Sequence, residues 1–176
     1  MARYSIVPER SQVWIDARSS VHPIHTATSG MEGYVELDLG PGGAVDLGRP
    51  PSGRLSLAVD RLRSGNRLED REMLKRIDAK RFPTIEGVLT RMAPDGPGNY
   101  RVSGDVTFRG VSRPHEDIME IRPVDDRTIR LAGSSRFDVR EYGMEPPRVL
   151  MLKVEPEVEV RVEIFAVRDD ADGAHG

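Results

Sequence analysis

A period of two in the hydrophobic pattern is the feature that most constrains the fold of this chain. The stretch 100–113 shows it best, because aromatic and valine side chains share one parity and mostly polar or charged side chains share the other. Successive side chains of a β-strand point to opposite faces, so this stretch is predicted to be one long strand with a single apolar face. Gly104 and Gly110 interrupt the apolar row and indicate a bulge or a bend.

The same alternation recurs along most of the chain. The expected strands cover residues 13–17, 31–39, 55–59, 85–92, 100–113, 116–124, 129–139 and 158–166, and the run 148–154 is apolar on both parities. Residues 66–77 lack the alternation; Asn66 suits a helix N-cap, Glu69 suits its capping-box partner, and Pro83 prevents continuation. This segment is predicted to be a helix of about three turns. The segment 19–30 is predicted to be a loop or an irregular edge, and the segment 40–53 a long turn.

Short turns between neighbouring strands indicate an all-β, antiparallel fold of about eight strands with one helix in a connection. A sheet of this size with one apolar face closes into a barrel or packs as a sandwich. A closed barrel of about eight strands has an interior that is filled by side chains or holds one small ligand. We expect one domain over residues 1–168 and a polar, disordered tail over residues 169–176.

Composition excludes several classes of function. The net charge of −3 gives no basic excess for a nucleic-acid backbone, so no nucleic-acid partner is expected. No apolar run approaches the ~20 residues of a membrane span, so no transmembrane segment is expected. The first ten residues contain no secretory apolar region, which predicts a cytoplasmic protein. The chain has no cysteine, so it can form neither disulfides nor thiolate sites.

Three segments of the chain, taken in order, form a pattern that is typical of one protein family. The first is Ile6-Val-Pro with Ser11-Gln-Val-Trp-Ile-Asp-Ala. The second is Ser64-Gly-Asn followed by Phe82-Pro-Thr-Ile. The third is Gly104-Asp-Val-Thr-Phe-Arg-Gly-Val-Ser-Arg-Pro. Over most of the chain they resemble the YceI-like, polyisoprenoid-binding family. The first is similar to the family's opening strand, the second to its helix and the next strand start, and the third to its Gly-x-Leu-Thr-Ile-Arg-Gly-Val-Thr-Arg-Pro.

This resemblance implies an extended, lipocalin-like barrel with a helix beside it and a tunnel for a long isoprenoid chain. A quinone tail or a polyprenyl phosphate would be such a ligand, and its burial would contribute about 25 cal/mol per Å² of apolar surface without any catalytic group. The candidate wall residues are the inward parity of each strand. They are Val13, Ile15, Val35, Leu57, Leu89, Val106, Phe108, Leu131 and Phe137.

Histidines are the remaining candidates for a ligand contact. His22 and His25 lie in a proline-containing segment and are predicted to touch a ligand at the barrel mouth. Their spacing is not diagnostic of a metal site, and no nucleophile elbow or phosphate-binding glycine loop is present. We therefore assign no catalytic residue, no metal and no cofactor. His115, beside Glu116 and Asp117, is a candidate proton-transfer group.

Three functions remain open. The first is a binding or carrier protein that sequesters an isoprenoid or a similar long apolar molecule. The second is an enzyme that acts on a lipid-like substrate, with His22, His25 or His115 as the acid or base. The third is a filled barrel that serves as a stress-response interaction module. An open sheet edge beside residues 148–154 would favour a homodimer.

Overall fold

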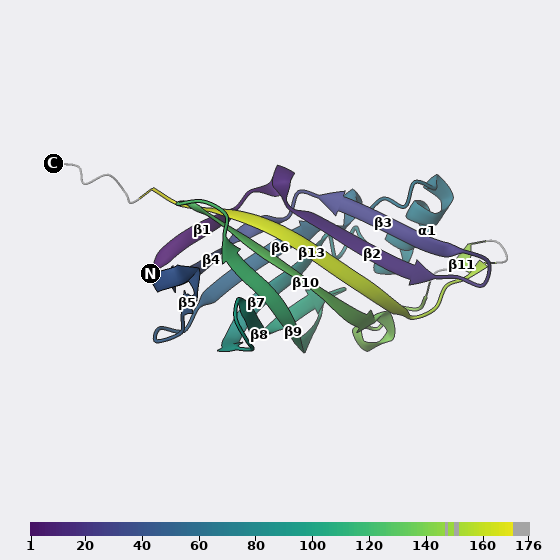
Figure 1. Ribbon diagram of the computed structural model, residues 1–176. Helices are drawn as coiled ribbons and strands as arrows, with labels where there is room; N and C mark the ends of the chain where they lie inside the picture. The colour runs from purple at the N-terminus through teal and green to yellow at the C-terminus, as the bar shows by residue number, and fades with distance from the viewer. Residues whose placement is uncertain (147, 150–151, 171–176) are drawn as a thin grey trace.

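Eight antiparallel strands close into a barrel, in the order β1, β4, β6, β7, β8, β9, β10 and β13, and β13 returns to β1 (Figure 1). The strands are β1 (Ala2–Ile6), β4 (Glu32–Leu39), β6 (Ser52–Ala58), β7 (Thr84–Pro94), β8 (Asn99–Phe108), β9 (Val111–Pro123), β10 (Thr128–Asp138) and β13 (Glu157–Arg168). The computed structural model describes residues 1–146, 148–149 and 152–170. The predicted all-β, antiparallel barrel is confirmed.

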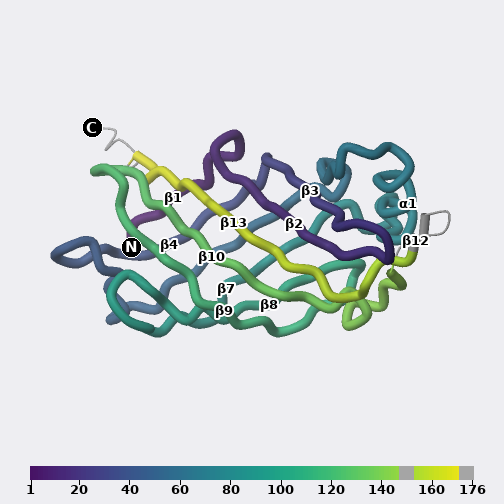
Figure 2. The backbone as a smooth tube through the Cα atoms, turned by 45° about the vertical axis from the view of Figure 1, so that its right-hand side comes forward, coloured from purple at the N-terminus to yellow at the C-terminus, as the bar shows by residue number. Residues whose placement is uncertain are grey.

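The long strand β13 closes the barrel by pairing with two different partners along one edge. Its C-terminal end pairs with β1, and its centre pairs with β2 (Gln12–Arg18) (Figure 2). Strand β1, which has five residues, also pairs with β4. It therefore connects β4 with β13 and closes the barrel. The sequence analysis did not predict β1, because a strand this short shows too little alternation.

A further strand, β3 (Pro23–Ser29), lies within the segment predicted to be a loop or an irregular edge. The loop alternative is wrong, because β3 is a paired strand at the end of the sheet order. Strand β3 pairs with β2 over its whole length, from Pro23 opposite Arg18 to Ser29 opposite Gln12. Backbone groups make these bonds whatever the side chains are, so the Ser, Thr and Pro content did not prevent pairing. The proline takes the first position of the strand, where a missing N–H is tolerated.

The predicted long strand 100–113 is instead a hairpin of β8 and β9. Arg109 and Gly110 form its two-residue turn with φ of 52° and 72°, a combination that suits tight hairpins. The side chain of Arg109 bonds to the carbonyl oxygen of Ile77, at 3.3 Å, and to that of Gly143. These contacts stabilise the positive φ of Arg109, which a residue other than glycine disfavours. They also connect the turn with Ile77 and Gly143.

Helix α1 (Arg67–Ile77) lies at one end of the barrel, here called the helix end (Figure 1). The predicted cap is confirmed: the side chain of Asn66 accepts hydrogen bonds from the N–H groups of Leu68 and Glu69. The backbone N–H of Asn66 bonds to Ser64 rather than to Glu69, so the capping box does not form. Within the described residues, no helix is long and apolar enough to cross a membrane.

Shorter elements complete both ends of the barrel. They are the 3₁₀ helices η1 (Pro8–Arg10), η2 (Pro41–Gly43), η3 (Val59–Arg61) and η4 (Val139–Tyr142), and the two-residue strands β5 (Val45–Asp46), β11 (Arg148–Val149) and β12 (Leu152–Lys153). The end opposite the helix, here called the plug end, is packed solid around Leu37, Tyr100 and Ile129, all at most 4% exposed. Val45 of β5 covers it, and its N–H donates to the Tyr100 hydroxyl at 2.8 Å.

Two predictions rest partly on residues outside the described part of the chain. One concerns the sheet edge beside the run 148–154, which includes residues 150–151. The other is the disordered tail, which involves residues 171–176. Val154, at the end of the first segment, is buried.

Candidate ligand-binding cavity

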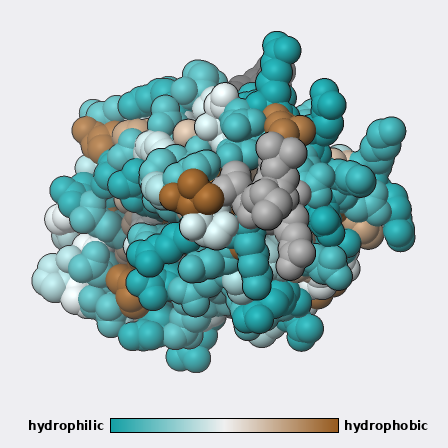
Figure 3. Space-filling view, turned by 90° about the vertical axis from the view of Figure 1, so that its right-hand side faces the viewer, coloured by the Kyte–Doolittle hydropathy of each residue, from teal (hydrophilic) through white to brown (hydrophobic). Residues whose placement is uncertain are grey.

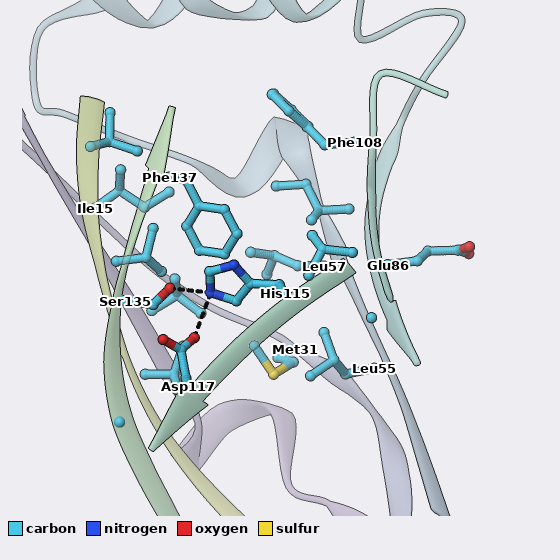
Figure 4. A pocket seen from close by; sticks show the side chains of 18 of the residues that line it. Ile15, Met31, Leu55, Leu57, Glu86, Phe108, His115, Asp117, Ser135 and Phe137 are labelled. Atoms are coloured by element: carbon cyan, nitrogen blue, oxygen red, sulfur yellow. Dashed lines mark hydrogen bonds and ion pairs between the residues drawn. The ribbon is translucent and has the colours of Figure 1, made fainter. Parts of the chain in front are cut away.

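A cavity of about 430 Å³ lies inside the barrel between the plug end and the helix end. Side chains from all eight barrel strands form its wall, and most of them are aliphatic or aromatic (Figure 4). Leu37, Tyr100 and Ile129 do not line it, so the plug end closes it. The volume falls in the range of roughly 300–1,000 Å³ that is typical of small-molecule sites.

The nine apolar residues predicted from strand parity all line this cavity: Val13, Ile15, Val35, Leu57, Leu89, Val106, Phe108, Leu131 and Phe137. Whether each of them touches a ligand stays a prediction. Inward parity was sufficient to select them because successive side chains of a β-strand point to opposite faces.

The two predicted histidines lie outside the cavity wall. Nδ1 of His22 lies 2.9 Å from the carbonyl oxygen of Pro23, and Nδ1 of His25 lies 2.6 Å from a carboxylate oxygen of Asp16. Their side chains are 47% and 70% exposed. Their contact with a ligand stays a prediction, and the structure does not bring them together with the apolar wall residues.

At the helix end, the wall is formed by α1, by η4 and by the segment that follows η4. Ile77, Tyr142 and Met144 are at most 5% exposed to solvent and line the cavity. Figure 3 views this end, where the surface is mostly hydrophilic with separated apolar patches. Two exposed apolar residues, Val21 between β2 and β3 and Leu68 of α1, belong to this region.

Glu69 is a buried carboxylate among these lining residues. It is 8% exposed, lines the cavity from α1, and has Oε1 3.7 Å from Nε2 of His22. The next residue, Asp70, accepts hydrogen bonds from the backbone N–H and the hydroxyl of Ser64. Glu69 was predicted as the capping-box partner of Asn66, so its place in the cavity wall was not expected from the sequence.

Aromatic rings form a row along one side of the cavity. Phe108 packs edge-to-face on Tyr142 with ring centroids 5.8 Å apart, and Tyr142 lies 6.4 Å from Phe137. Phe137 in turn stacks on the imidazole of His115 at 4.2 Å. The row connects the helix end with the middle of the barrel and fixes the plane of the His115 ring.

His115 is part of a polar cluster with Asp117 and Ser135. Its Nε2 lies 2.6 Å from Oδ2 of Asp117 and 2.5 Å from Oγ of Ser135 (Figure 4). A Ser-His-Asp catalytic triad needs the carboxylate and the hydroxyl on different ring nitrogens. Here both partners share Nε2, so the cluster does not have the geometry of a triad. In the described part of the chain, no three His, Asp or Glu side chains are grouped so as to hold a metal ion.

His115 was predicted as a candidate proton-transfer group but not as a wall residue, because the strand was expected to start at Glu116. The turn at Arg109 and Gly110 shifts this start to Val111, so that His115 lies well inside β9. His115 and Asp117 then share the inward parity. If Arg109 and Gly110 had been recognised as a tight turn, the sequence would have placed His115 and Asp117 on the inner face of the barrel.

Burial raises the pKa of the Tyr142 phenol; the negative charge of Glu141 adds to this rise and Arg113 opposes it. The folded protein therefore keeps the Tyr142 proton at a pH where the unfolded chain loses it. We expect the free energy of unfolding to fall as pH rises through about 10, the ordinary pKa of tyrosine.

Urea unfolding between pH 8 and 11 checks this expectation for the wild type and for Tyr142→Phe. The variant lacks the phenol proton, so its stability should fall less steeply over this range. Equal slopes for the two proteins would contradict the assignment.

No curated protein matches the sequence. Solved structures that share the fold include BcnA of Burkholderia cenocepacia, a polyisoprenoid binding domain from Saccharophagus degradans implicated in plant cell wall breakdown, and the YCEI protein of Campylobacter jejuni. BcnA is 17% identical with a TM-score of 0.77, and the match covers 92% of this chain and 99% of BcnA.

The Saccharophagus domain is 11% identical with a TM-score of 0.75, over 94% of this chain and 98% of its own. The Campylobacter protein is 11% identical with a TM-score of 0.63, over 83% and 85%. At these identities the three matches establish the fold. The family model of the YceI-like domain matches residues 4–166, nearly the whole chain. The protein therefore belongs to the family of YceI-like domains.

Proposed function

We propose that this protein binds a long apolar molecule of the isoprenoid class inside the barrel and so sequesters or carries it. The observation that carries this proposal is the cavity of about 430 Å³, walled mostly by aliphatic and aromatic side chains. Such a wall offers little to a charged or strongly polar ligand and much to a hydrocarbon chain.

The expected driving force is burial of the ligand's apolar surface. Each 200 Å² removed from water contributes about 5 kcal/mol at about 25 cal/mol per Å². Part of this gain offsets the freedom that the ligand loses on binding. The family membership and the polyisoprenoid binding domain from Saccharophagus degradans agree with this ligand class.

The two alternative functions receive less support. A filled barrel acting only as an interaction module does not match a cavity of this size. An enzyme that uses His22 or His25 would need those side chains at the substrate, whereas both are largely exposed and neither lines the cavity. His115 does line the cavity, and its arrangement fits a binding contact better than a catalytic triad.

Native mass spectrometry of protein purified from its own host tests the proposal. We expect a bound molecule at about one per chain, identified as an isoprenoid after organic extraction. Protein that is bare as purified, and stays bare after incubation with quinones and polyprenyl phosphates, would sink the proposal. The same spectra report the oligomeric state, for which a homodimer stays a prediction.

A further inference from the structure

The cluster of His115, Asp117 and Ser135 is a polar site set in a mainly apolar wall. His115 and Asp117 project from β9 and Ser135 from β10, and all three line the cavity (Figure 4). Polar groups in such a wall cost free energy unless they are hydrogen-bonded. A wall that only enclosed hydrocarbon would not need them.

Hydrogen bonds within the cluster assign the tautomer of His115. An ionised carboxylate can only accept, so the 2.6 Å contact with Oδ2 of Asp117 places a hydrogen on Nε2. In the neutral form of the imidazole, Nδ1 then carries the lone pair. Asp117 therefore acts as a positioning residue that makes Nδ1 an acceptor.

The Nδ1 atom of His115 is free to meet a ligand. It points away from Asp117 (Figure 4), and it has no hydrogen-bond partner among the residues that the structure describes. In that part of the chain, no fully buried side-chain nitrogen or oxygen lacks a partner, so Nδ1 keeps accessible surface. Since the His115 side chain lines the cavity, that surface faces the space where a ligand would lie.

The cavity also leaves room for a hydrocarbon chain beyond this site. His115 and Ile121 both line the cavity from β9, roughly 20 Å apart along the strand at about 3.3 Å per residue. We infer that the ligand is an isoprenoid alcohol or phenol whose hydroxyl group donates a hydrogen bond to Nδ1 of His115. This inference rests on the proposed function, because it names the polar group of the same apolar ligand.

A pair of ligands that differ only in the donor hydrogen tests the inference. Geranylgeraniol has a hydroxyl, and its methyl ether keeps the chain and the oxygen but cannot donate. We expect the wild type to bind the alcohol about tenfold more tightly, the usual scale of one hydrogen bond. Displacement of a fluorescent lipid probe measures both affinities in the same buffer.

Two variants test whether the preference for the alcohol over the ether arises at the cluster. In His115→Leu, the alcohol should lose its advantage while the ether keeps its affinity, because the wall stays apolar. In Asp117→Asn, the amide can donate to Nε2, so Nδ1 gains a hydrogen and the preference for the alcohol should shrink. Glu116→Gln is the matched control: its side chain is 52% exposed, bonds to Arg101 outside the barrel, and should leave the tenfold preference unchanged.

The outcomes separate the two proposals. Equal affinities of the wild type for alcohol and ether would overturn this inference and leave the proposed function standing. A preference that persists in His115→Leu would overturn it too. If neither ligand binds to the wild type, the proposed function fails and this inference fails with it.

Discussion

Replacing Gly33 with alanine is expected to lower the free energy of unfolding by about 4 kcal/mol or more, which approaches the whole stability of many domains. Gly33 lies in β4 with φ of 138°, a conformation that side chains disfavour. A Cβ atom there would lie 2.0 Å from the carbonyl oxygen of Arg54 and 2.8 Å from Cα of Leu55. Both are backbone atoms of the paired strand β6, so no change of rotamer relieves the clash.

Gly42→Ala is the matched control for this prediction. Gly42 also has a positive φ, of 76°, but a Cβ atom there meets nothing within 4 Å. Its substitution should cost only the backbone strain, about 1 kcal/mol. Urea unfolding followed by circular dichroism gives both values. Similar losses in the two variants would mean that backbone strain, and not the clash with β6, decides the stability at Gly33.

Filling the cavity with a tryptophan at Val160 is expected to weaken ligand binding by at least about 100-fold, or about 2.8 kcal/mol. Val160 lines the cavity from β13, opposite Ile15 on one side and Ser135 on the other. Tryptophan has about seven more non-hydrogen atoms than valine. Each ligand methylene group that they exclude from the cavity weakens binding by about 0.8 kcal/mol. The variant should stay folded, because Val160 borders the cavity and the new ring can extend into that space.

Glu159→Trp provides the comparison. Glu159 is the neighbour of Val160 on β13, is exposed and points to the outer face. The same ring added there leaves the cavity unchanged, so binding should stay within about twofold of the wild type, less than 0.5 kcal/mol. Retention of an isoprenoid after purification, seen by native mass spectrometry, is the readout. Undiminished binding in Val160→Trp would place the ligand elsewhere.

Much of the barrel was predictable because parity alone assigns the inner face of a long strand. The nine predicted wall residues share that inner face, as do Tyr100 and Ile129 of the packed plug end. Strands β1 and β3 were not predictable in this way. Their place in the sheet depends on backbone pairing with distant strands, which a local pattern of side chains does not record.

Prediction of the polar cluster depended on the position of a single turn. With stretch 100–113 taken as one strand, His115 falls at a strand end and its partner Ser135 is not a candidate. The positive φ angles of Arg109 and Gly110 are held by contacts to Ile77 and Gly143, far away in the sequence. The position of the turn, and with it the direction of the His115 side chain, is thus a tertiary property.

Closure of the barrel by β1 and β13 has a consequence for the order of events during synthesis. The first and last strands described are neighbours, and near their junction Ser5 donates to Asp169, 164 residues later in the chain. Contacts at such separation form late, after the local hairpins. A nascent chain that lacks β13 leaves the wall open and its apolar face uncovered. The cavity therefore forms only after β13 has been translated, and a ligand can bind only when the barrel closes or later.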